Sequence, residues 1–168
     1  MKLLPTRVNR SPGVAFRHGL DLALKKRADI IVNIDADGQY NATQIPALIK
    51  PILDGKADIV LGWRDIGNLD HMPWSKKLGN KLATWITRKL SGFPVKDAQA
   101  GFRAFSREAA LRLNSFGTYT YVQETLIQAS HKGQHIEQVP VEFRAGPGKS
   151  WFSSSFESFH HPEEGWKK

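Results

Sequence analysis

The sequence of 168 residues contains no cysteine and no long apolar run. The absence of cysteine excludes disulfide bonds and metal sites built from thiolates, and it fits a reducing compartment. A membrane-spanning helix needs about 18 consecutive apolar residues, and no stretch of this chain reaches that length. Residues 1–10 contain a proline and two arginines where a secretory signal would have its apolar centre, so we read no signal peptide. These absences predict a cytoplasmic location, which includes a peripheral position at the inner face of a membrane.

Acidic residues are few relative to basic ones. The chain has 24 lysines and arginines against 16 aspartates and glutamates, which gives a net charge of +8. Such a charge favours phosphates, nucleic acid or an anionic membrane surface as partners, although a solvated basic surface without a partner explains it as well. The basic residues are spread along the chain and no nucleic-acid-binding motif is present, so we expect no nucleic acid partner.

Short apolar strands alternate with amphipathic helices along most of the chain. The hydrophobic content of 40% is enough for the core of one domain. The expected strands are residues 28–35, 57–63 and 138–145, and the expected helices are residues 11–27, 45–55, 74–90, 106–114 and 122–133. This order predicts an α/β domain over residues 1–150, with a mostly parallel sheet flanked by helices. Residues 151–168 have no period, and we expect them to be irregular or disordered.

The expected helix over residues 74–90 combines an apolar stripe with many positive charges. The stripe consists of Leu78, Leu82, Trp85, Ile86 and Leu90. Any helix on the surface of an α/β domain needs such a stripe to pack on the sheet. A basic helix with tryptophans can also lie in the interface of a membrane. The sequence leaves both interpretations open.

Two acids follow the first expected strand in the stretch "NIDADGQ". If the chain stays extended there, the side chains of Asp35 and Asp37 point to the same side, at the carboxyl end of a strand where open α/β sheets bind ligands. Two carboxylates on one side repel unless a cation lies between them, and oxygen ligands favour Mg²⁺ or Mn²⁺. Gln39 offers a further oxygen, and Gly38 lets a bulky ligand approach the backbone. The alternative is a turn in which an aspartate caps the next helix.

Further polar residues follow these acids in an order that resembles glycosyltransferase family 2, which has the GT-A fold. The most specific match is "NIDADGQYNATQIPALIKPI", which resembles the D-A-D-G-Q stretch of the family. "NRSPGVAFRHGLDLA" resembles its N-x-G helix start, "IVLGWR" its V-x-G-S-R, and "VKDAQAGFRAFSREA" its D-x-Q-S-G-F-R-A-F-R-R segment. "TYVQETLIQA" resembles its acidic helix, and "VPVEFRAGPGKS" its closing R-x-x-x-G-x-S loop. The resemblance is to the group of dolichol-phosphate mannosyltransferases and polyprenyl-phosphate glycosyltransferases.

This resemblance implies transfer of a sugar, with inversion, from a nucleoside-diphosphate sugar to an acceptor such as a polyprenyl or dolichyl phosphate. It implies Mg²⁺ or Mn²⁺ as the cofactor. The residues implied for the metal and the diphosphate are Asp35, Asp37 and Gln39. The residue implied for catalysis is Asp97, with Glu124 as the second choice. The residues implied for substrate binding are Arg64, Gln99, Arg103, Arg144 and Lys149.

The sequence also departs from the pattern of the family. Trp63 and Ala100 stand where the family has serine. Members begin with a β-α-β portion that holds the nucleotide base, whereas this chain begins just before the "NRSPG" helix, so we expect an incomplete catalytic domain. One alternative is a non-catalytic remnant that binds a membrane or a protein partner through its basic face. Another is a sugar-phosphate nucleotidyltransferase, which would need a glycine-rich phosphate loop near the start that this sequence lacks.

Overall fold

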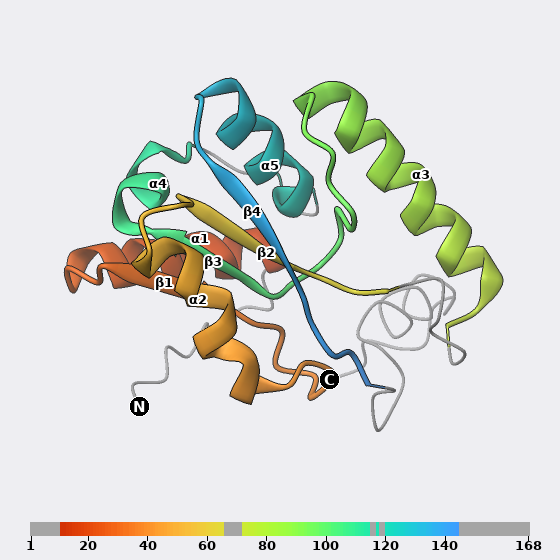
Figure 1. Cartoon of the computed structure of the whole chain (residues 1–168), viewed down its shortest axis with the longest axis horizontal. Coiled ribbons are helices and arrows are strands. Elements are labelled where there is room, and N and C mark those ends of the chain that lie inside the picture. The colour runs from red at the N-terminus through yellow and green to blue at the C-terminus, as the bar shows by residue number, and fades with distance from the viewer. Residues whose placement is uncertain (1–10, 66–71, 115–116, 118–119, 145–168) are drawn as a thin grey trace, which may run out of the picture.

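The computed structural model describes residues 11–65, 72–114, 117 and 120–144. The helices are α1 (Pro12–Lys25), the short 3-10 helix η1 (Ala42–Gln44), α2 (Ile45–Leu53), α3 (Trp74–Ser91), α4 (Arg107–Arg112) and α5 (Tyr121–His131). The strands are β1 (Ile30–Asn33), β2 (Ile59–Trp63), β3 (Arg103–Ser106) and β4 (Ile136–Pro140). Figure 1 shows the described part of the chain as a small twisted sheet with helices around it.

The four described strands form one sheet in the order β1-β3-β2-β4. Strand β3 runs antiparallel to both β1 and β2, while β2 and β4 are parallel. Strands β1, β2 and β4 therefore share one direction, as expected for a mostly parallel sheet, and β3 opposes them. The sequence analysis assigned no strand to residues 103–106. The segment lacked a recognisable period because β3 is only four residues long and is covered on both faces.

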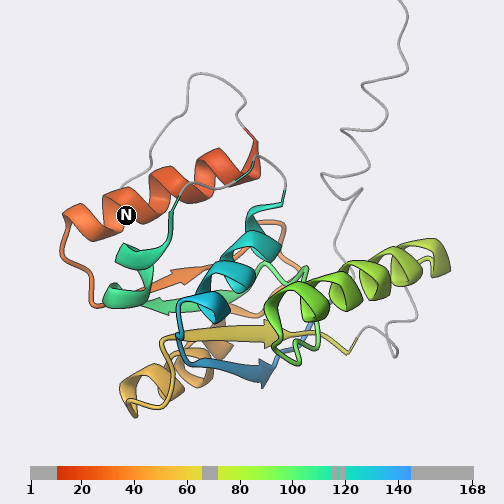
Figure 2. The same ribbon diagram turned by 90° about the horizontal axis from the view of Figure 1, so that it is seen from above.

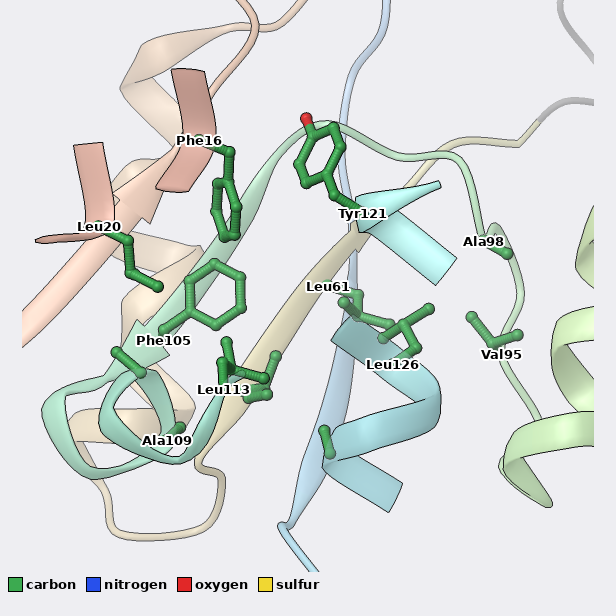
Figure 3. Packing of buried hydrophobic residues seen from close by; sticks show 13 residues of the cluster. Phe16, Leu20, Leu61, Val95, Ala98, Phe105, Ala109, Leu113, Tyr121 and Leu126 are labelled. Carbon is green, nitrogen blue, oxygen red and sulfur yellow. The ribbon is translucent and has the colours of Figure 1, made fainter. Parts of the chain in front are cut away.

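Both faces of the sheet are covered by helices. On one face, Phe16 and Leu20 of α1 and Leu126 of α5 pack against Phe105 of β3 and Leu61 of β2 (Figure 3). On the other face, helix α2 packs over alternate residues of the same strands. The first four residues of β2 are buried, which fits the near-continuous apolar run of a strand that is covered on both sides. Strand β1 lies at the edge of the described sheet and is only half-buried.

Helix α2 has a fully buried residue near its middle and an exposed C-terminal end. Leu48 is fully buried, and Pro51 lies inside the helix without ending it. Gly55 follows the helix with a φ of +68°, a conformation that a residue without a side chain adopts at little cost. Leu53, the last residue of the helix, is 67% exposed.

Helix α3 packs through its polar residues rather than through its apolar stripe. The residues of α3 that are buried are Asn80, Thr84, Thr87 and Ser91. The residues of the expected apolar stripe are exposed, each by 43% or more. The interpretation that this stripe packs on the sheet is therefore wrong for the described structure. The C-terminal half of α3 lies beside α5, and the N-terminal half extends away from the sheet (Figures 1 and 2).

The buried hydroxyl groups of α3 are satisfied within the helix or by its neighbours. Thr87 and Ser91 donate hydrogen bonds to the carbonyl oxygens of Ala83 and Thr87, at 2.8 and 2.7 Å. Ser130 of α5 donates to the carbonyl of Ser91 at 2.5 Å. Satisfied hydroxyls can be buried at low cost, which is how a polar helix face packs against the domain. None of the helices in the described ranges is both long enough and apolar enough to cross a bilayer.

Candidate functional site

The candidate site lies at the edge of the sheet where β1, β2 and β4 end. Because these strands share one direction, the segments that follow them emerge at the same edge. Strand β3 runs the other way, so the segment that precedes it reaches this edge too. Asn33 pairs with Arg103, and Trp63 pairs with Pro140. This topology brings the acidic turn, the residues after β2, residues 97–101 and the end of β4 together.

The acidic turn after β1 is fixed against the backbone of Gly101. The Asn33 side chain donates a hydrogen bond to the Gly101 carbonyl at 2.6 Å, and the Gly101 N–H donates to the Tyr40 hydroxyl at 3.1 Å. The Asp35 carboxylate lies against the Cα of Gly101. A Cβ atom at position 101 would be 1.9 Å from Asp35 Oδ2. Gly101 is therefore required for the observed position of the Asp35 carboxylate.

Asp37 forms a turn rather than a helix cap. The Gln39 N–H donates to Asp37 Oδ1 at 3.0 Å, and Gly38 between them has a φ of +75°. The following helix η1 is capped by Asn41, whose side chain accepts from the Thr43 N–H at 3.1 Å. Asp37 therefore forms the turn that the alternative interpretation expected. It does not cap the next helix, because Asn41 does.

The electrostatic state of Asp35 reflects its position. Partial burial of the carboxylate raises the pKa of Asp35, and the nearby negative charge of Asp37 raises it further. The positive charges of Arg103 and Arg64 act in the opposite direction. A cation bound between the two carboxylates would remove the repulsion and favour the ionised form.

The residues present fit a divalent ion that is held only in part by protein. In the part of the chain that the structure describes, there is no group of three or more His, Cys, Asp or Glu side chains suited to a metal. Two carboxylates on a glycine-containing turn match the way in which Mg²⁺ is bound by one or two carboxylates together with water and substrate phosphates. Gln39 faces the end of β4, because its side-chain nitrogen donates to the Arg144 carbonyl at 3.3 Å.

Arg64 and Asp97 form a buried ion pair beside this turn. Arg64 Nε and NH2 donate to the two Asp97 oxygens at 2.6 and 3.1 Å. The side chain of Asp97 is 0% exposed and that of Arg64 is 10% exposed. Burial alone would lower the pKa of Arg64, but the hydrogen bond to Asp97 and the nearby acidic groups together outweigh burial, so that the pKa is raised.

The Asp97 carboxylate is also held by two neutral donors. Asn80 of α3 donates to Oδ1 at 3.3 Å, and the Gln99 N–H donates to the same atom at 3.1 Å. Asn80 also donates to the Gln99 side-chain oxygen at 3.1 Å. A general base needs an accessible oxygen within hydrogen-bond reach of the substrate. The geometry of Asp97 therefore supports a role in orienting Arg64 and the surrounding loop.

Arg103 occupies a different place from the expected substrate contact. Its guanidinium lies over the rings of Phe16, Phe105 and Tyr121, 5.1 to 5.7 Å from their centroids. The residue is 0% exposed, and none of its guanidinium nitrogens makes a hydrogen bond of normal geometry within the described residues. Burial lowers the pKa of Arg103. In this arrangement Arg103 supplies a positive charge near Asp35.

The other expected residues are placed as follows. Glu124 lies in the first turn of α5, where it accepts hydrogen bonds from the Gly117 N–H at 2.6 Å and from the Thr120 hydroxyl, as a capping carboxylate does. Arg144 comes next to the acidic turn, because its N–H donates to the Gln39 carbonyl at 2.9 Å. Lys149 and the expected irregular tail lie outside the described residues.

A basic groove of about 530 Å³ is bordered by α3 on one side, and by the end of β2 and the loop before β3 on the other. Its lining residues are Trp63, Arg64, Asp65, Asn80, Lys81, Thr84, Trp85, Arg88 and Lys96. The Lys96 ammonium lies 4.3 Å from the centroid of the Trp63 ring. The sequence analysis did not single out Asn80, Lys81 or Lys96 as site residues. The sequence could have indicated Asn80, because Asn80 and Thr84 are polar residues spaced so that both lie on one face of α3.

A mixed α/β sheet, with helices on both faces and an acidic turn at the edge where three strands end, agrees with the expected GT-A class. The family model described as Glycosyl transferase family 2 matches residues 1–113. The chain belongs to glycosyltransferase family 2.

Curated relatives carry names that concern lipid phosphates. The chain is 36% identical over 139 residues to UDP-N-acetylglucosamine--dolichyl-phosphate N-acetylglucosaminyltransferase of Methanococcus voltae, covering 80% of this chain and 55% of that protein. It is 27% identical over 137 residues to polyprenol monophosphomannose synthase of Mycolicibacterium smegmatis, covering 78% and 51%. The chain thus spans about half the length of these relatives.

Solved structures confirm the fold. Glucosyl-3-phosphoglycerate synthase from Mycobacterium tuberculosis in complex with phosphoglyceric acid superposes with a TM-score of 0.66 at 23% identity, over 90% of this chain and 51% of that one. The same enzyme in complex with Mn²⁺, uridine diphosphate and phosphoglyceric acid gives 0.65 at 22% identity, with the same coverage. At this level of identity, the similarity concerns the fold alone.

Proposed function

We propose that this chain contributes to a glycosyltransferase that moves a sugar from a nucleoside-diphosphate sugar to a polyprenyl-type lipid phosphate, as in the synthesis of glycolipids. The observation that carries the proposal is the acidic turn of Asp35 and Asp37, held beside the buried ion pair of Arg64 and Asp97 at one edge of the sheet. The printed names of the relatives support the lipid phosphate as acceptor. The Mn²⁺ and uridine diphosphate in a solved structure of the same fold support the donor and the metal.

On the donor side, Asp35, Asp37 and Gln39 would hold Mg²⁺ or Mn²⁺ together with the diphosphate. The ion would supply charge stabilisation for the leaving diphosphate. Arg144, whose backbone pairs with Gln39, and Lys149 would approach the same phosphates. Arg103 would act through its positive charge, which lowers the pKa of Asp35 and so favours the ionised form that binds a cation.

On the acceptor side, the basic groove supplies positive charges for the lipid phosphate. In the proposed reaction, an oxygen of this phosphate attacks C1 of the sugar from the side opposite the diphosphate. The bond between C1 and the diphosphate oxygen breaks, and the nucleoside diphosphate leaves with the electron pair. A phosphate is already anionic at neutral pH, so no general base is needed. Asp97 would then orient Arg64, in agreement with its buried and fully paired carboxylate.

The experiment that tests the donor site measures binding of uridine or guanosine diphosphate by calorimetry, with and without Mn²⁺. We expect weak binding that depends on the metal and is lost in Asp37→Ala. The matched control is Asp21→Ala, which removes an exposed carboxylate on α1 and should leave binding unchanged. Equal binding in the presence and absence of Mn²⁺, or an unchanged affinity in Asp37→Ala, would contradict the proposed site.

The second candidate is a non-catalytic module that binds a membrane or a protein partner. The specific observation in its favour is that most of the exposed large apolar residues of the described structure lie on the basic helix α3. It predicts that the 168 residues bind no diphosphate at all. Metal-dependent binding in the calorimetry would decide against it.

A further inference from the structure

The exposed apolar side chains of the described structure gather on one helix. Eight large apolar residues are exposed, and six of them belong to α3. We define the α3 apolar face as these six residues: Trp74, Leu78, Leu82, Trp85, Ile86 and Leu90. Their exposed fractions range from 43% to 77%. The remaining two, Leu53 and Leu111, lie singly on α2 and α4. A contiguous apolar surface of this kind marks an interaction site, whereas scattered residues do not.

The orientation of α3 leaves this face without a partner in the described residues. At 3.6 residues per turn, the six side chains cover roughly 160° of the helix circumference. The buried residues Asn80, Thr84, Thr87 and Ser91 lie on nearly the opposite side. Their hydrogen bonds to the Asp97 loop and to α5 fix this orientation. The helix therefore cannot turn its apolar face inward without breaking a satisfied polar interface.

The charges of α3 narrow the choice of partner. The helix carries five cations and no acid. The cations are Lys76, Lys77, Lys81, Arg88 and Lys89. A basic helix with a wide apolar face that includes tryptophans has the composition of helices that lie in the plane of a membrane interface. Anionic lipid headgroups would neutralise the cations, and the tryptophan rings would sit at the level of the headgroups. A second copy of the same face would instead bring five cations against five.

We propose that the α3 apolar face docks on the surface of an anionic bilayer. The helix would lie along the interface with Leu78 and Leu82 inserted, while its polar side stays on the domain. Trp85 belongs both to this face and to the lining of the basic groove, so that docking places the groove beside the headgroups. The inference concerns a surface of the described structure and does not require transfer activity, although it gives the proposed lipid acceptor a route to the groove.

The experiment is co-sedimentation of the full 168-residue chain with vesicles of phosphatidylcholine, alone or with 30% phosphatidylglycerol (about one anionic lipid in three), at low and high salt. We expect binding to the anionic vesicles at low salt and weaker binding to the neutral ones. The apolar variant Leu78→Ser with Leu82→Ser should weaken binding at least about tenfold, because it removes inserted surface. The charge variant Lys76→Glu with Lys89→Glu should weaken it by a similar factor, because it reverses attraction to the headgroups.

Each variant has a matched control on another surface. Leu53→Ser with Leu111→Ser removes two exposed leucines outside α3, and Lys25→Glu with Lys26→Glu makes the same change of net charge at the end of α1. Both controls should bind vesicles like the wild type. Thermal unfolding, followed by circular dichroism, shows whether each variant is folded, and metal-dependent diphosphate binding should persist in all of them.

Four outcomes would overturn the proposal. The first is unchanged sedimentation of both α3 variants. The second is equal loss of binding in the controls, which would assign the effect to overall charge or hydrophobicity. The third is a wild-type dimer that the apolar variant dissociates, in the absence of vesicle binding, which would make a second copy the occupant. The fourth is tryptophan fluorescence that acrylamide cannot quench before vesicles are added, which would show that another part of this chain covers the face. Loss of diphosphate binding alone would contradict the proposed function and leave the docking surface in place.

Discussion

At the candidate site, the carboxylates of Asp35 and Asp97 are each held in place by residues from other segments of the chain. The Asp35 carboxylate is placed by its contact with the Gly101 backbone, and its charge is opposed by burial and by Asp37 but favoured by Arg103 and Arg64. Asp97 is placed by Arg64 on one side and by Asn80 of α3 on the other. Each site carboxylate is therefore fixed by residues distant in sequence, and replacing one of those residues should move it.

The raised pKa of Asp35 predicts the sign of its effect on stability. Because the folded pKa lies above the unfolded value, ionisation of Asp35 is less favourable in the folded protein. The cost in stability grows as pH rises from the unfolded pKa to the folded pKa and is constant above it. Asp35→Asn removes this cost, so we expect the melting temperature of the metal-free protein to rise by about 1–2 °C at pH 7. The gain should vanish below the unfolded pKa of an aspartate, near pH 3.8.

Differential scanning fluorimetry across this pH range measures the effect. The same variant should lose the stabilisation that Mn²⁺ with uridine diphosphate gives to the wild type, since the ligand is then missing a carboxylate. Asp21→Asn, at an exposed position on α1, is the control and should change neither quantity. A lower melting temperature for Asp35→Asn at pH 7 would show that the carboxylate is stabilised in the fold.

Asn80 should act as a positioning residue for the Asp97 loop. Asn80→Ala removes a donor to Asp97 and to Gln99, together with the acceptor of the Thr84 hydroxyl. We expect the free energy of unfolding to fall by about 1–3 kcal/mol, because buried polar groups lose partners. Asn80→Asp should cost more at neutral pH, since it adds a second carboxylate beside Asp97, and part of the loss should return in acid.

Urea titrations at pH 7 and pH 4.5 would measure both variants of Asn80. The control is Lys76→Ala, an exposed position on the same helix, which should change the free energy of unfolding by less than about 0.5 kcal/mol. If Asn80→Asp is as stable as Asn80→Ala at both pH values, then Asn80 is not packed against the carboxylate of Asp97.

At the level of the elements, the sequence predicted helices and strands where it contained a capping residue or a regular spacing of apolar residues. Ser106 caps α4 at the start of the expected range, since its hydroxyl accepts from the Ala109 N–H at 3.1 Å. Ser11 is the N-cap residue of α1, where its side chain makes no capping hydrogen bond, and Gly133 follows the end of α5 with a positive φ. Strand β3 was missed because four buried residues that include an arginine show neither alternation nor an apolar run.

Helix α3 shows why an apolar stripe does not by itself give the orientation of a helix. The period predicted the helix correctly, because spacing of three and four residues is a property of the helix alone. Which face is buried depends on what the neighbouring segments offer. Here the loop of residues 97–99 offers polar groups, and it pairs with Asn80 and Thr84. The candidate residues on the acidic turn could be predicted from their motif, whereas the Asp97 network required the fold.

Strand β3 should be the centre of stability of the sheet. Phe105 is fully buried, pairs with both Ile31 and Ile59, and lies with its ring 5.7 Å from that of Phe16. Phe105→Ala should lower the free energy of unfolding by about 3–5 kcal/mol, because it leaves a cavity between the sheet and helix α1. Urea denaturation measures this, with Leu111→Ala as the control, since 58% of Leu111 is exposed. A loss as small as that of the control would show that the sheet does not depend on this strand.

At the scale of the whole molecule, the described structure places its chemistry at one edge and its apolar surface next to it. The acidic turn, the Arg64–Asp97 pair and the end of β4 meet at the edge where three strands end. The basic groove joins this edge to α3. The positive net charge of the chain is thus partly concentrated on α3, which carries five of the 24 basic residues.

The two sides of α3 also differ in what substitution they tolerate. On an ordinary surface helix, the outer side accepts most polar residues, and constraint is confined to the inner side. On α3 the inner side needs hydrogen-bonding groups of a given size, because Asn80 and Thr84 have fixed partners. If the outer side is used for docking, it needs bulk and hydrophobicity. Mutational tolerance along α3 should then be low all round the helix, with opposite chemical preferences on its two sides, so that exchanging a residue between the sides fails in both directions.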